Sequence, residues 1–365
     1  MDDRPFILQQ QTYVRLLPRR SLDFQSRMLA IFGERLQHEE STKPQILILS
    51  RLDDREADVV GLQLAAHGIP YLRINADSLL TETKFTFYRD FQNVKASIHS
   101  SGWSLHTLGV IWFRHFDVSA ISFPQTDPIT EYFVRAEWMT AIRSLMSIST
   151  VDWINHPDII HKLDRMSQLQ LADAVGLTTP KTLVSNEPED IRSFITLCSG
   201  KAVVKVLGDH FLETTPGTLQ GIFPRLIVES DADILKETLS VPSLYQEYIP
   251  HITEVRVTII DQEVIAAEVE KANPEDIWHH PDKVFVQSHQ LPLRVKERLQ
   301  QYMKISGLRF GAFDLLLTSS NDYIFLEVNP IGDWLWLEAR NKDINVTETV
   351  VACMVKLIDE KERAL

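Results

Sequence analysis

The sequence predicts an α/β N-terminal domain followed by an α+β module of two subdomains. Apolar runs alternate with stretches of helical spacing up to about residue 155, which is typical of a sheet with parallel strands. The later part is rich in strands, with few helices between them. A length of 365 residues also exceeds one ordinary core. We expect an extension and linker over 1–44, the α/β domain over 45–155, and subdomains over 156–249 and 250–365.

The α/β domain is predicted from one βαβ unit and the elements that follow it. A buried strand, 45–50, precedes a helix over 54–67 that Gly68 ends, and the next strand covers 71–74. Further elements are a strand at 110–114 and a helix over 130–147, and Asn155-His156-Pro157 marks the boundary. In the extension we expect short strands at 6–8 and 14–17 and a helix over 22–36, before Pro44 breaks the chain.

The second half combines segregated helices with many strands. Helices are expected over 159–175, 188–198 (entered through Asn186), 292–306 and 346–361. Strands are expected at 182–184, 202–206, 226–229, 244–248, 254–260, 263–270, 312–318 and 323–328. A glycine-punctuated stretch, Gly208–Gly221, has the character of a loop that approaches a phosphate closely.

Composition narrows the class of protein. The formal net charge is −13 and the pI is near 5.4, which argues against a nucleic-acid partner without forbidding a local basic groove. No apolar run approaches the length of a membrane span, and the N-terminus does not resemble a secretion signal. Cys198 and Cys353 lie far apart in apolar surroundings, so we expect half-buried structural thiols rather than a disulfide. The sequence predicts a cytoplasmic protein with no membrane partner.

The clearest chemical signal consists of two apolar strands that carry acids. Asp314 lies within 311–317, and Glu327-Val328-Asn329-Pro330 follows a polar turn. As a hairpin, these strands place Asp314 opposite Glu327, while Glu327 and Asn329 share one face. Carboxylate and amide oxygens are ligands that Mg²⁺ prefers, and two buried carboxylates need a cation. Solvent-facing acids are the simpler alternative, but the joint pattern favours a metal site.

Basic residues supply a second signal. Lys205 ends a buried strand, where a charged amine is costly unless an anion receives it. Arg256 shares a strand face with Glu254, and its planar fork of donors suits phosphate. The strand 254–260 could instead be an amphipathic edge strand with a surface ion pair.

Together these motifs resemble the ATP-grasp ligases, with the first domain as the pre-ATP-grasp domain. The resemblance implies ATP and Mg²⁺ as cofactors, two ions being expected, with metal ligands Asp314, Glu327 and Asn329. It implies an adenine-binding hinge in Tyr245-Gln246-Glu247-Tyr248-Ile249-Pro250, formed by Gln246, Glu247, Tyr248 and Ile249. It further implies that Glu254 binds the ribose, and that Lys205 and Arg256 contact the reacting phosphates. Arg165 occupies the position of a second cation, with Lys162 as a nearby alternative.

The sequence most resembles one branch of the ATP-grasp ligases, the microviridin-type or graspetide synthetases, which macrocyclise ribosomal peptides. The shared segments are 153–157, 176–186 and 327–334, within a resemblance that covers about 45–350. It implies a precursor peptide with leader and core as partner, and a homodimer. The sequence departs from the family at Arg114-His115, where a second arginine is usual, and at Trp278-His279-His280, where an arginine is expected. The extension is also longer than expected.

The implied reaction passes through an acyl-phosphate that an amine or alcohol then attacks, releasing ADP and phosphate. His210, His279 and His280 are candidate bases. A small-molecule ATP-grasp ligase, joining an amino acid to a peptide or amine, is one alternative. A catalytically silent ATP-binding scaffold is the other, and the intact acids, Lys205 and Arg256 argue against it.

Overall fold

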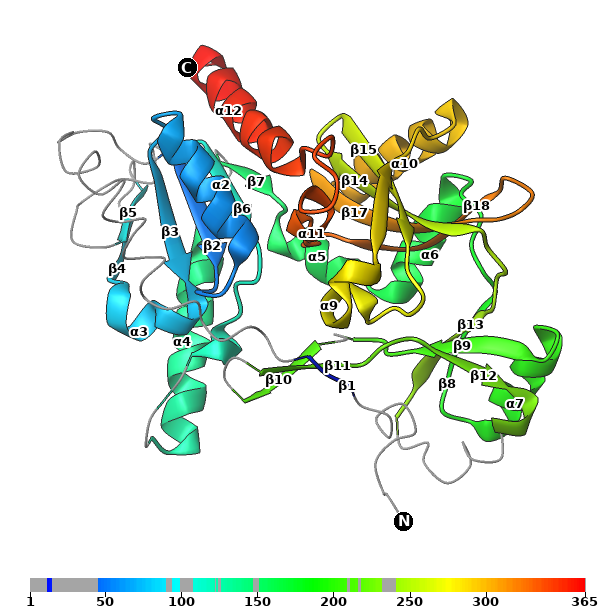
Figure 1. The fold of residues 1–365 in the computed structure, drawn as a ribbon. Coiled ribbons are helices and arrows are strands. Elements are labelled where there is room, and N and C mark those ends of the chain that lie inside the picture. The colour runs from blue at the N-terminus through cyan, green and yellow to red at the C-terminus, as the bar shows by residue number, and fades with distance from the viewer. Residues whose placement is uncertain are drawn as a thin grey trace.

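In a computed structural model, the described residues are 12–14, 45–89, 94–98, 108–121, 123, 126–146, 151–208, 211–215, 218–231 and 241–364. They form three larger sheets, with a small three-stranded sheet and one two-stranded ribbon (Figure 1). The predicted elements at 6–8 and 22–36 lie outside the described residues, as do residues 15–17 of the strand expected at 14–17.

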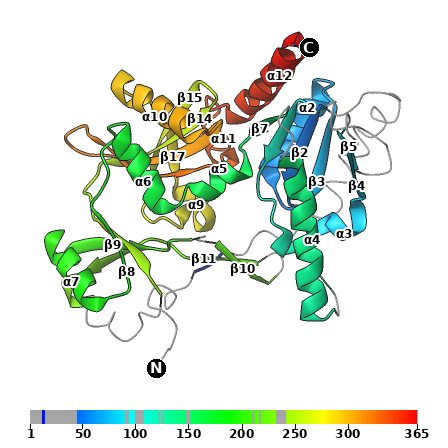
Figure 2. The same cartoon turned by 180° about the vertical axis from the view of Figure 1, so that it is seen from behind.

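The first sheet is parallel and has the order β3-β2-β6-β7. Its strands are β2 (Ile46–Ser50), β3 (Tyr71–Asn75), β6 (Val110–Phe113) and β7 (Asp152–Ile154). Helix α2 (Arg55–Ala66) packs with α12 (Val346–Ala364) on one face, whereas α4 (Pro128–Met146) lies on the other (Figure 2). Burial on both faces explains why β2 is apolar at four successive residues, 46–49. A short helix, α3 (Leu79–Glu82), and the ribbon of β4 (Phe85–Arg89) and β5 (Val94–Ile98) follow β3.

The second sheet is antiparallel and has the order β12-β9-β13-β8. It consists of β8 (Thr182–Ser185), β9 (Lys201–Lys205), β12 (Arg225–Val228) and β13 (Ser243–Glu247). Helix α7 (Pro188–Leu197) buries Ile191, Phe194 and Ile195 against this sheet. Glu187, rather than the expected Asn186, is the residue that enters this helix, because Pro188 occupies its first position.

The third sheet is antiparallel and has the order β16-β15-β14-β17-β18. Its strands are β14 (Thr253–Ile260), β15 (Glu263–Glu270), β16 (Phe285–Ser288), β17 (Phe310–Leu317) and β18 (Tyr323–Asn329). One face packs on α10 (Leu293–Ser306) and α6 (Arg165–Ala174), and Tyr302, Phe313 and Phe325 form the aromatic centre of that core. The opposite face is apolar at one end, where Ile260, Phe310 and Ala312 join the core around Trp334, and it carries charged residues further along.

The single helix expected over 159–175 is wrong. Two helices occupy it, α5 (Pro157–Lys162) and α6. Asp164 begins the second helix, because its carboxylate accepts hydrogen bonds from the amides of Met166 and Ser167, each at 2.9 Å. The break fixes the direction of α6, and Arg165 becomes its first residue.

The glycine-punctuated stretch forms a hairpin rather than an open loop. Strands β10 (Phe211–Thr215) and β11 (Thr218–Gly221) pair antiparallel, and β1 (Thr12–Val14) of the N-terminal extension adds to β11. Residues 209, 210, 216 and 217 lie outside the described part of the chain. Both cysteines are free, as predicted, and they are buried rather than half-buried, because each packs within a hydrophobic core. No helix in the described ranges has the length and apolarity to cross a bilayer.

Candidate active site

One row of charged side chains crosses the third sheet. Arg256 on β14 is in register with Asp314 on β17, and Asp314 is in register with Glu327 on β18. Directly opposed residues of a sheet share a face, so the three side chains lie on the same side, away from the aromatic core. The predicted pairing of Asp314 with Glu327 is confirmed. Their role as metal ligands stays a prediction.

Both acids of the row are paired with guanidinium groups. Arg256 Nη1 donates to both oxygens of Asp314, each at 2.8 Å. Arg165, at the start of α6, forms an ion pair with Glu327. Lys162 is exposed at the end of α5, so the structure favours Arg165 over it as the second cation. The two carboxylates thus lie side by side, each with a guanidinium group as its counter-charge.

Lys205 belongs to the second sheet and lies close to this row of charged side chains. It is the last residue of β9, and Arg165, Asp314 and Glu254 all lie within electrostatic range of its amine. Burial and the Arg165 charge lower the pKa of Lys205 to about 8, although the two acids oppose this. An amine that is poorly neutralised in the free protein is suited to receiving an anion.

Glu254 has a partner that the sequence analysis missed. Lys271, directly after β15, forms an ion pair with its carboxylate, and the lysine side chain is only 7% exposed. Val269 is opposite Glu254, and Lys271 is two residues further along the same strand direction. The alternation of β15 was therefore a signal that could have identified Lys271.

The expected hinge connects the second and third sheets. Gln246 is buried, and its side-chain amide donates to Thr182 Oγ1 at 3.3 Å, whereas its Oε1 is buried without a partner among the described residues. Glu247 pairs with Lys181 at 2.9 Å. Tyr248 is 38% exposed and Ile249 is half-buried, beyond the end of β13. Tyr248 and Ile249 have thus left the sheet, whereas Gln246 and Glu247 are the last two residues of β13.

The turn after β18 is held at several points. Asn329 Oδ1 accepts from the amide of Ile331 at 3.0 Å, and Gln168 of α6 accepts from the amide of Val328 at 3.0 Å. Asn155 donates to the carbonyl of Pro330 at 2.9 Å. Asn155 was singled out in the sequence as a boundary residue and Gln168 lies in a predicted helix, but these two contacts join residues 160 or more positions apart. Local pattern could not reveal them.

The donor set fits a magnesium–triphosphate group. Asp314, Glu327 and Asn329 supply oxygen atoms on one strand face, and Arg256 has a buried Nε without a partner among the described residues. A divalent ion could replace the guanidinium groups as the counter-charge of the two carboxylates, which would release both arginines for phosphate. The set has two carboxylates and one amide, and the described residues contain no group of three or more His, Cys, Asp or Glu side chains suited to a metal.

The candidate bases are less well defined. His210 lies outside the described residues. His279 ends the short helix α9 (Asp276–His279), and its Nε2 is buried with no hydrogen-bond partner among the described residues. His280 is exposed. Asp276 is buried and accepts from the amide of Asn273 at 2.8 Å, so it stabilises the start of α9.

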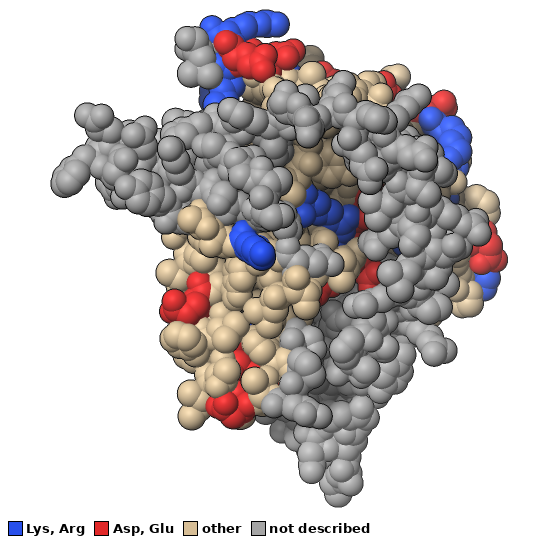
Figure 3. Space-filling view, turned by 90° about the vertical axis from the view of Figure 1, so that its left-hand side faces the viewer, with Lys and Arg blue, Asp and Glu red and all other residues tan. Residues whose placement is uncertain are grey.

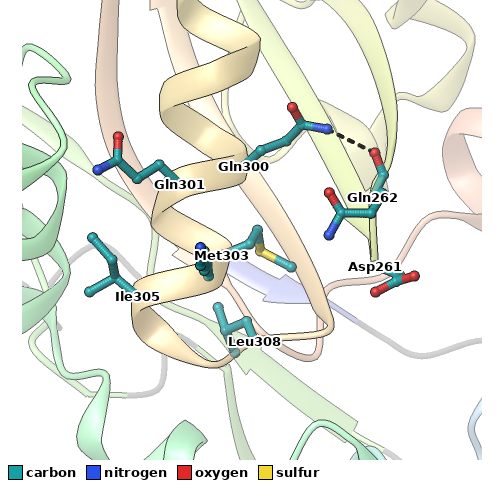
Figure 4. A pocket seen from close by; sticks show the side chains of 8 residues that line it. Asp261, Gln262, Gln300, Gln301, Met303, Ile305 and Leu308 are labelled. Atoms are coloured by element: carbon teal, nitrogen blue, oxygen red, sulfur yellow. Dashed lines mark hydrogen bonds between the residues drawn. The ribbon is translucent and has the colours of Figure 1, made fainter.

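A separate pocket of about 740 Å³ lies at the other end of the third sheet (Figure 4). The C-terminal half of α10 and the β14–β15 turn line it, and Gln300 donates to the carbonyl of Gln262 at 3.0 Å across one side. None of the predicted site residues contributes to its lining. We therefore assign the chemistry to the charged row and not to this pocket.

The structure as a whole defines an ATP-grasp fold, and comparison with known proteins supports this. No family model matches the sequence, and no curated protein does. Solved structures do match. The macrocyclase MdnC of Microcystis aeruginosa MRC, bound with precursor peptide MdnA, has a TM-score of 0.74 and 25% identity, over 85% of this chain and 99% of MdnC.

Two further similar structures carry ligands of interest. A RiPP-associated ATP-grasp ligase of Chryseobacterium gregarium, in complex with ADP and a leader and core peptide, has a TM-score of 0.74 and 19% identity, over 86% of this chain and 97% of that one. The ATP-grasp ligase PsnB, with minimal precursor, Mg and ADP, has a TM-score of 0.69 and 18% identity, over 86% and 98%. The predicted resemblance to peptide-maturing ATP-grasp ligases is confirmed.

Proposed function

We propose that this protein is an ATP-dependent ligase that modifies a ribosomally made precursor peptide by forming ester or amide bonds. The observation that carries the proposal is the single face on which Arg256, Asp314 and Glu327 are aligned, with Lys205 and Arg165 next to them. The similarity to MdnC, which was solved with its precursor peptide, supports a peptide as the substrate.

The proposal assigns ATP to the space between the second and third sheets. The hinge residues Gln246–Ile249 would bind adenine, Glu254 the ribose, and the row the phosphates. Two Mg²⁺ ions would be held by Asp314, Glu327 and Asn329. The division at residues 44, 155 and 249 belongs to the same proposal: an extension, a pre-ATP-grasp domain and two ATP-grasp subdomains. PsnB, solved with Mg and ADP, supports this use of the fold.

The chemistry needs positioning and charge rather than a nucleophilic side chain. A substrate carboxylate attacks the γ-phosphorus, the bond to the β-phosphate oxygen breaks, and ADP leaves. Mg²⁺, when bound, offsets charge on the phosphate oxygens. Arg256 and Lys205 would stabilise the transferring phosphoryl group, and their positions beside Asp314 support this role. The amine or alcohol then attacks the acyl carbon, phosphate leaves, and an ester or amide remains.

The surface charge is compatible with an anionic ligand despite the net charge of −13. Figure 3 shows a hollow in the face next to the first sheet, with Lys or Arg atoms at its base and Asp or Glu atoms beside them. Substrates with phosphate or carboxylate groups gain from such a basic floor.

Mass spectrometry of the peptide encoded beside this gene, after incubation with enzyme and ATP, tests the proposal. Cyclisation removes one water from the peptide for each bond formed, whereas ligation of an amino acid adds residue mass and would favour the small-molecule alternative. The variants Asp314→Asn and Glu327→Gln should abolish the change in mass. Turnover of ATP that survives both substitutions would show that the metal assignment is wrong.

Two finer expectations remain part of the proposal. The protein is expected to be a homodimer, by its resemblance to the family, and sedimentation velocity of the purified chain measures this directly. We place it in the cytoplasm, where ATP is available and the buried thiols Cys198 and Cys353 stay reduced.

A further inference from the structure

A buried cluster of charges lies between the first sheet and the turn that follows β18. Its centre is Arg114, directly after β6, whose side chain is only 1% exposed. Arg114 Nε donates to Asp54 Oδ2 at 2.8 Å, and Nη2 donates to Asp333 Oδ1 at 2.8 Å. Glu56 Oε2 is 3.8 Å from the same Nη2. The Arg114 guanidinium thus joins Asp54 and Glu56, near the start of α2, to Asp333, which lies 219 positions away from Arg114 in the sequence.

Two tryptophans enclose this guanidinium. Its central carbon is 5.2 Å from the ring centroid of Trp112 and 5.1 Å from that of Trp334. A planar cation can stack on aromatic rings and donate sideways to carboxylates at the same time, whereas an ammonium cannot. The hydrogen bond from His115 and the charge of Arg114 hold the pKa of Asp333 below its usual range, although the loss of some surrounding water opposes this. The geometry of the cluster is therefore specific to arginine.

The cluster controls the position of the turn that carries Asn329. Asp333 is four residues beyond Asn329, and Glu56 Oε1 accepts from the amides of Trp334 at 3.1 Å and Leu335 at 3.2 Å. Gly332, inside the turn, touches the site: a Cβ there would lie 2.9 Å from Arg256 Nη2 and 2.6 Å from the Ala312 Cβ. A shift of the turn would therefore move Asn329 and displace the Arg256 guanidinium.

We propose that Arg114 is a positioning residue for the metal and phosphate site, acting through Asp333 on the turn 329–333. The proposal rests on the proposed function, since it takes Asn329 as a metal ligand and Arg256 as a phosphate ligand. It assigns a role to the first sheet: β6 and α2 fix one side of the metal site from outside it. Partners of metal ligands commonly have effects of this kind on metal affinity.

Calorimetric titration of ADP, with and without Mg²⁺, tests the proposal in the purified full-length protein. Arg114→Lys keeps the charge but loses the planar fork, and Asp333→Asn keeps the shape but loses the charge. Both are expected to reduce the Mg²⁺-dependent gain in ADP affinity by roughly 10-fold, with little change in affinity without Mg²⁺. Combined, the two substitutions should cost no more than either alone, because they break the same contact.

A matched control is Arg73→Lys. Arg73 also lies in the first sheet and pairs with Asp58, but it does not contact the turn. This variant should keep the full Mg²⁺-dependent gain. Unchanged gain in both Arg114→Lys and Asp333→Asn would overturn the proposal, as would an equal loss in the Arg73 control. Wild-type protein that binds ADP without any effect of Mg²⁺ would instead overturn the proposed metal site itself. Because Asp333 is 55% exposed, Asp333→Asn tests the contact even if Arg114→Lys does not fold.

Discussion

Asn155 offers a direct test of how the ATP-grasp core is attached to the first sheet. Its side chain lies at the end of β7, and the residue is only 1% exposed. The amide nitrogen donates to the carbonyls of Phe310 at 2.7 Å and Pro330 at 2.9 Å. The amide oxygen accepts from the backbone amides of Arg309 at 2.7 Å and Phe310 at 3.0 Å. One side chain thus satisfies two donors and two acceptors of distant backbone.

Replacing Asn155 with alanine should destabilise the protein strongly. The substitution leaves four backbone groups without their partner, and each unsatisfied buried group costs about 1–3 kcal/mol. Taking the lower value for each group, since water can enter part of the space, the expected loss is about 4 kcal/mol. Total stabilities of folded domains are about 5–15 kcal/mol, so this loss would be a large fraction of the whole.

Urea unfolding followed by tryptophan fluorescence measures the loss. The matched control is Asn341→Ala, which removes hydrogen bonds of 3.3 and 3.5 Å from its amide nitrogen and one of 2.9 Å from the amide of Asp343 to its oxygen. The site is less buried, so water can replace these partners and the loss should be about 1 kcal/mol or less. Equal unfolding slopes in all three proteins are needed for the comparison. The argument is refuted if Asn155→Ala unfolds at the same urea concentration as Asn341→Ala.

Three further predictions concern charge. Burial and the Arg165 charge set the pKa of Lys205 to about 8, so ADP affinity should fall between pH 7 and 9 in wild type as the amine loses its proton, and calorimetry should show no such fall in Lys205→Met. A pH-independent wild-type affinity would contradict this. For Asp314→Asn we expect a loss of ATP turnover of at least about 100-fold, with ADP binding in the absence of Mg²⁺ retained; equal losses of both would indicate unfolding instead. Burial and the charge of Asp333 raise the pKa of Glu56 from 4.5 to about 7. The folded state therefore holds the Glu56 proton more tightly than the unfolded state does, and the stability that this proton provides is lost as the pH rises through 7. Glu56→Gln, which can still accept from the two amides, should therefore be more stable than wild type at pH 8, by about 3 kcal/mol at most, and equal to it near pH 4; thermal melts at both values decide.

Much of the fold follows from local patterns in the sequence. The strands 46–50, 254–260 and 310–317 were visible as apolar or alternating runs, because burial on one or both faces of a sheet imposes that period on neighbouring residues. The same alternation placed Asp314 opposite Glu327, since a hairpin has few possible registers. Helix starts were less certain, and the break at Asp164 was missed although aspartate is a common first residue of a helix.

Sequence by itself thus determined the order of elements, the acidic strand face and the free state of the two thiols. Tertiary structure alone decided which distant residues meet. Arg114 with Asp333, Asn155 with Pro330, and Gln168 with Val328 are separated by 219, 175 and 160 positions. The physical reason is that a hydrogen bond between distant residues forms only when the sheets pack together, so neither partner shows a local pattern in the sequence. The alternation of side chains is instead imposed on each strand by its own burial, and neighbouring residues reveal it. The face of the strand on which the acids lie follows from neighbouring residues alone, whereas the position of the turn beside it depends on residues far away in the sequence.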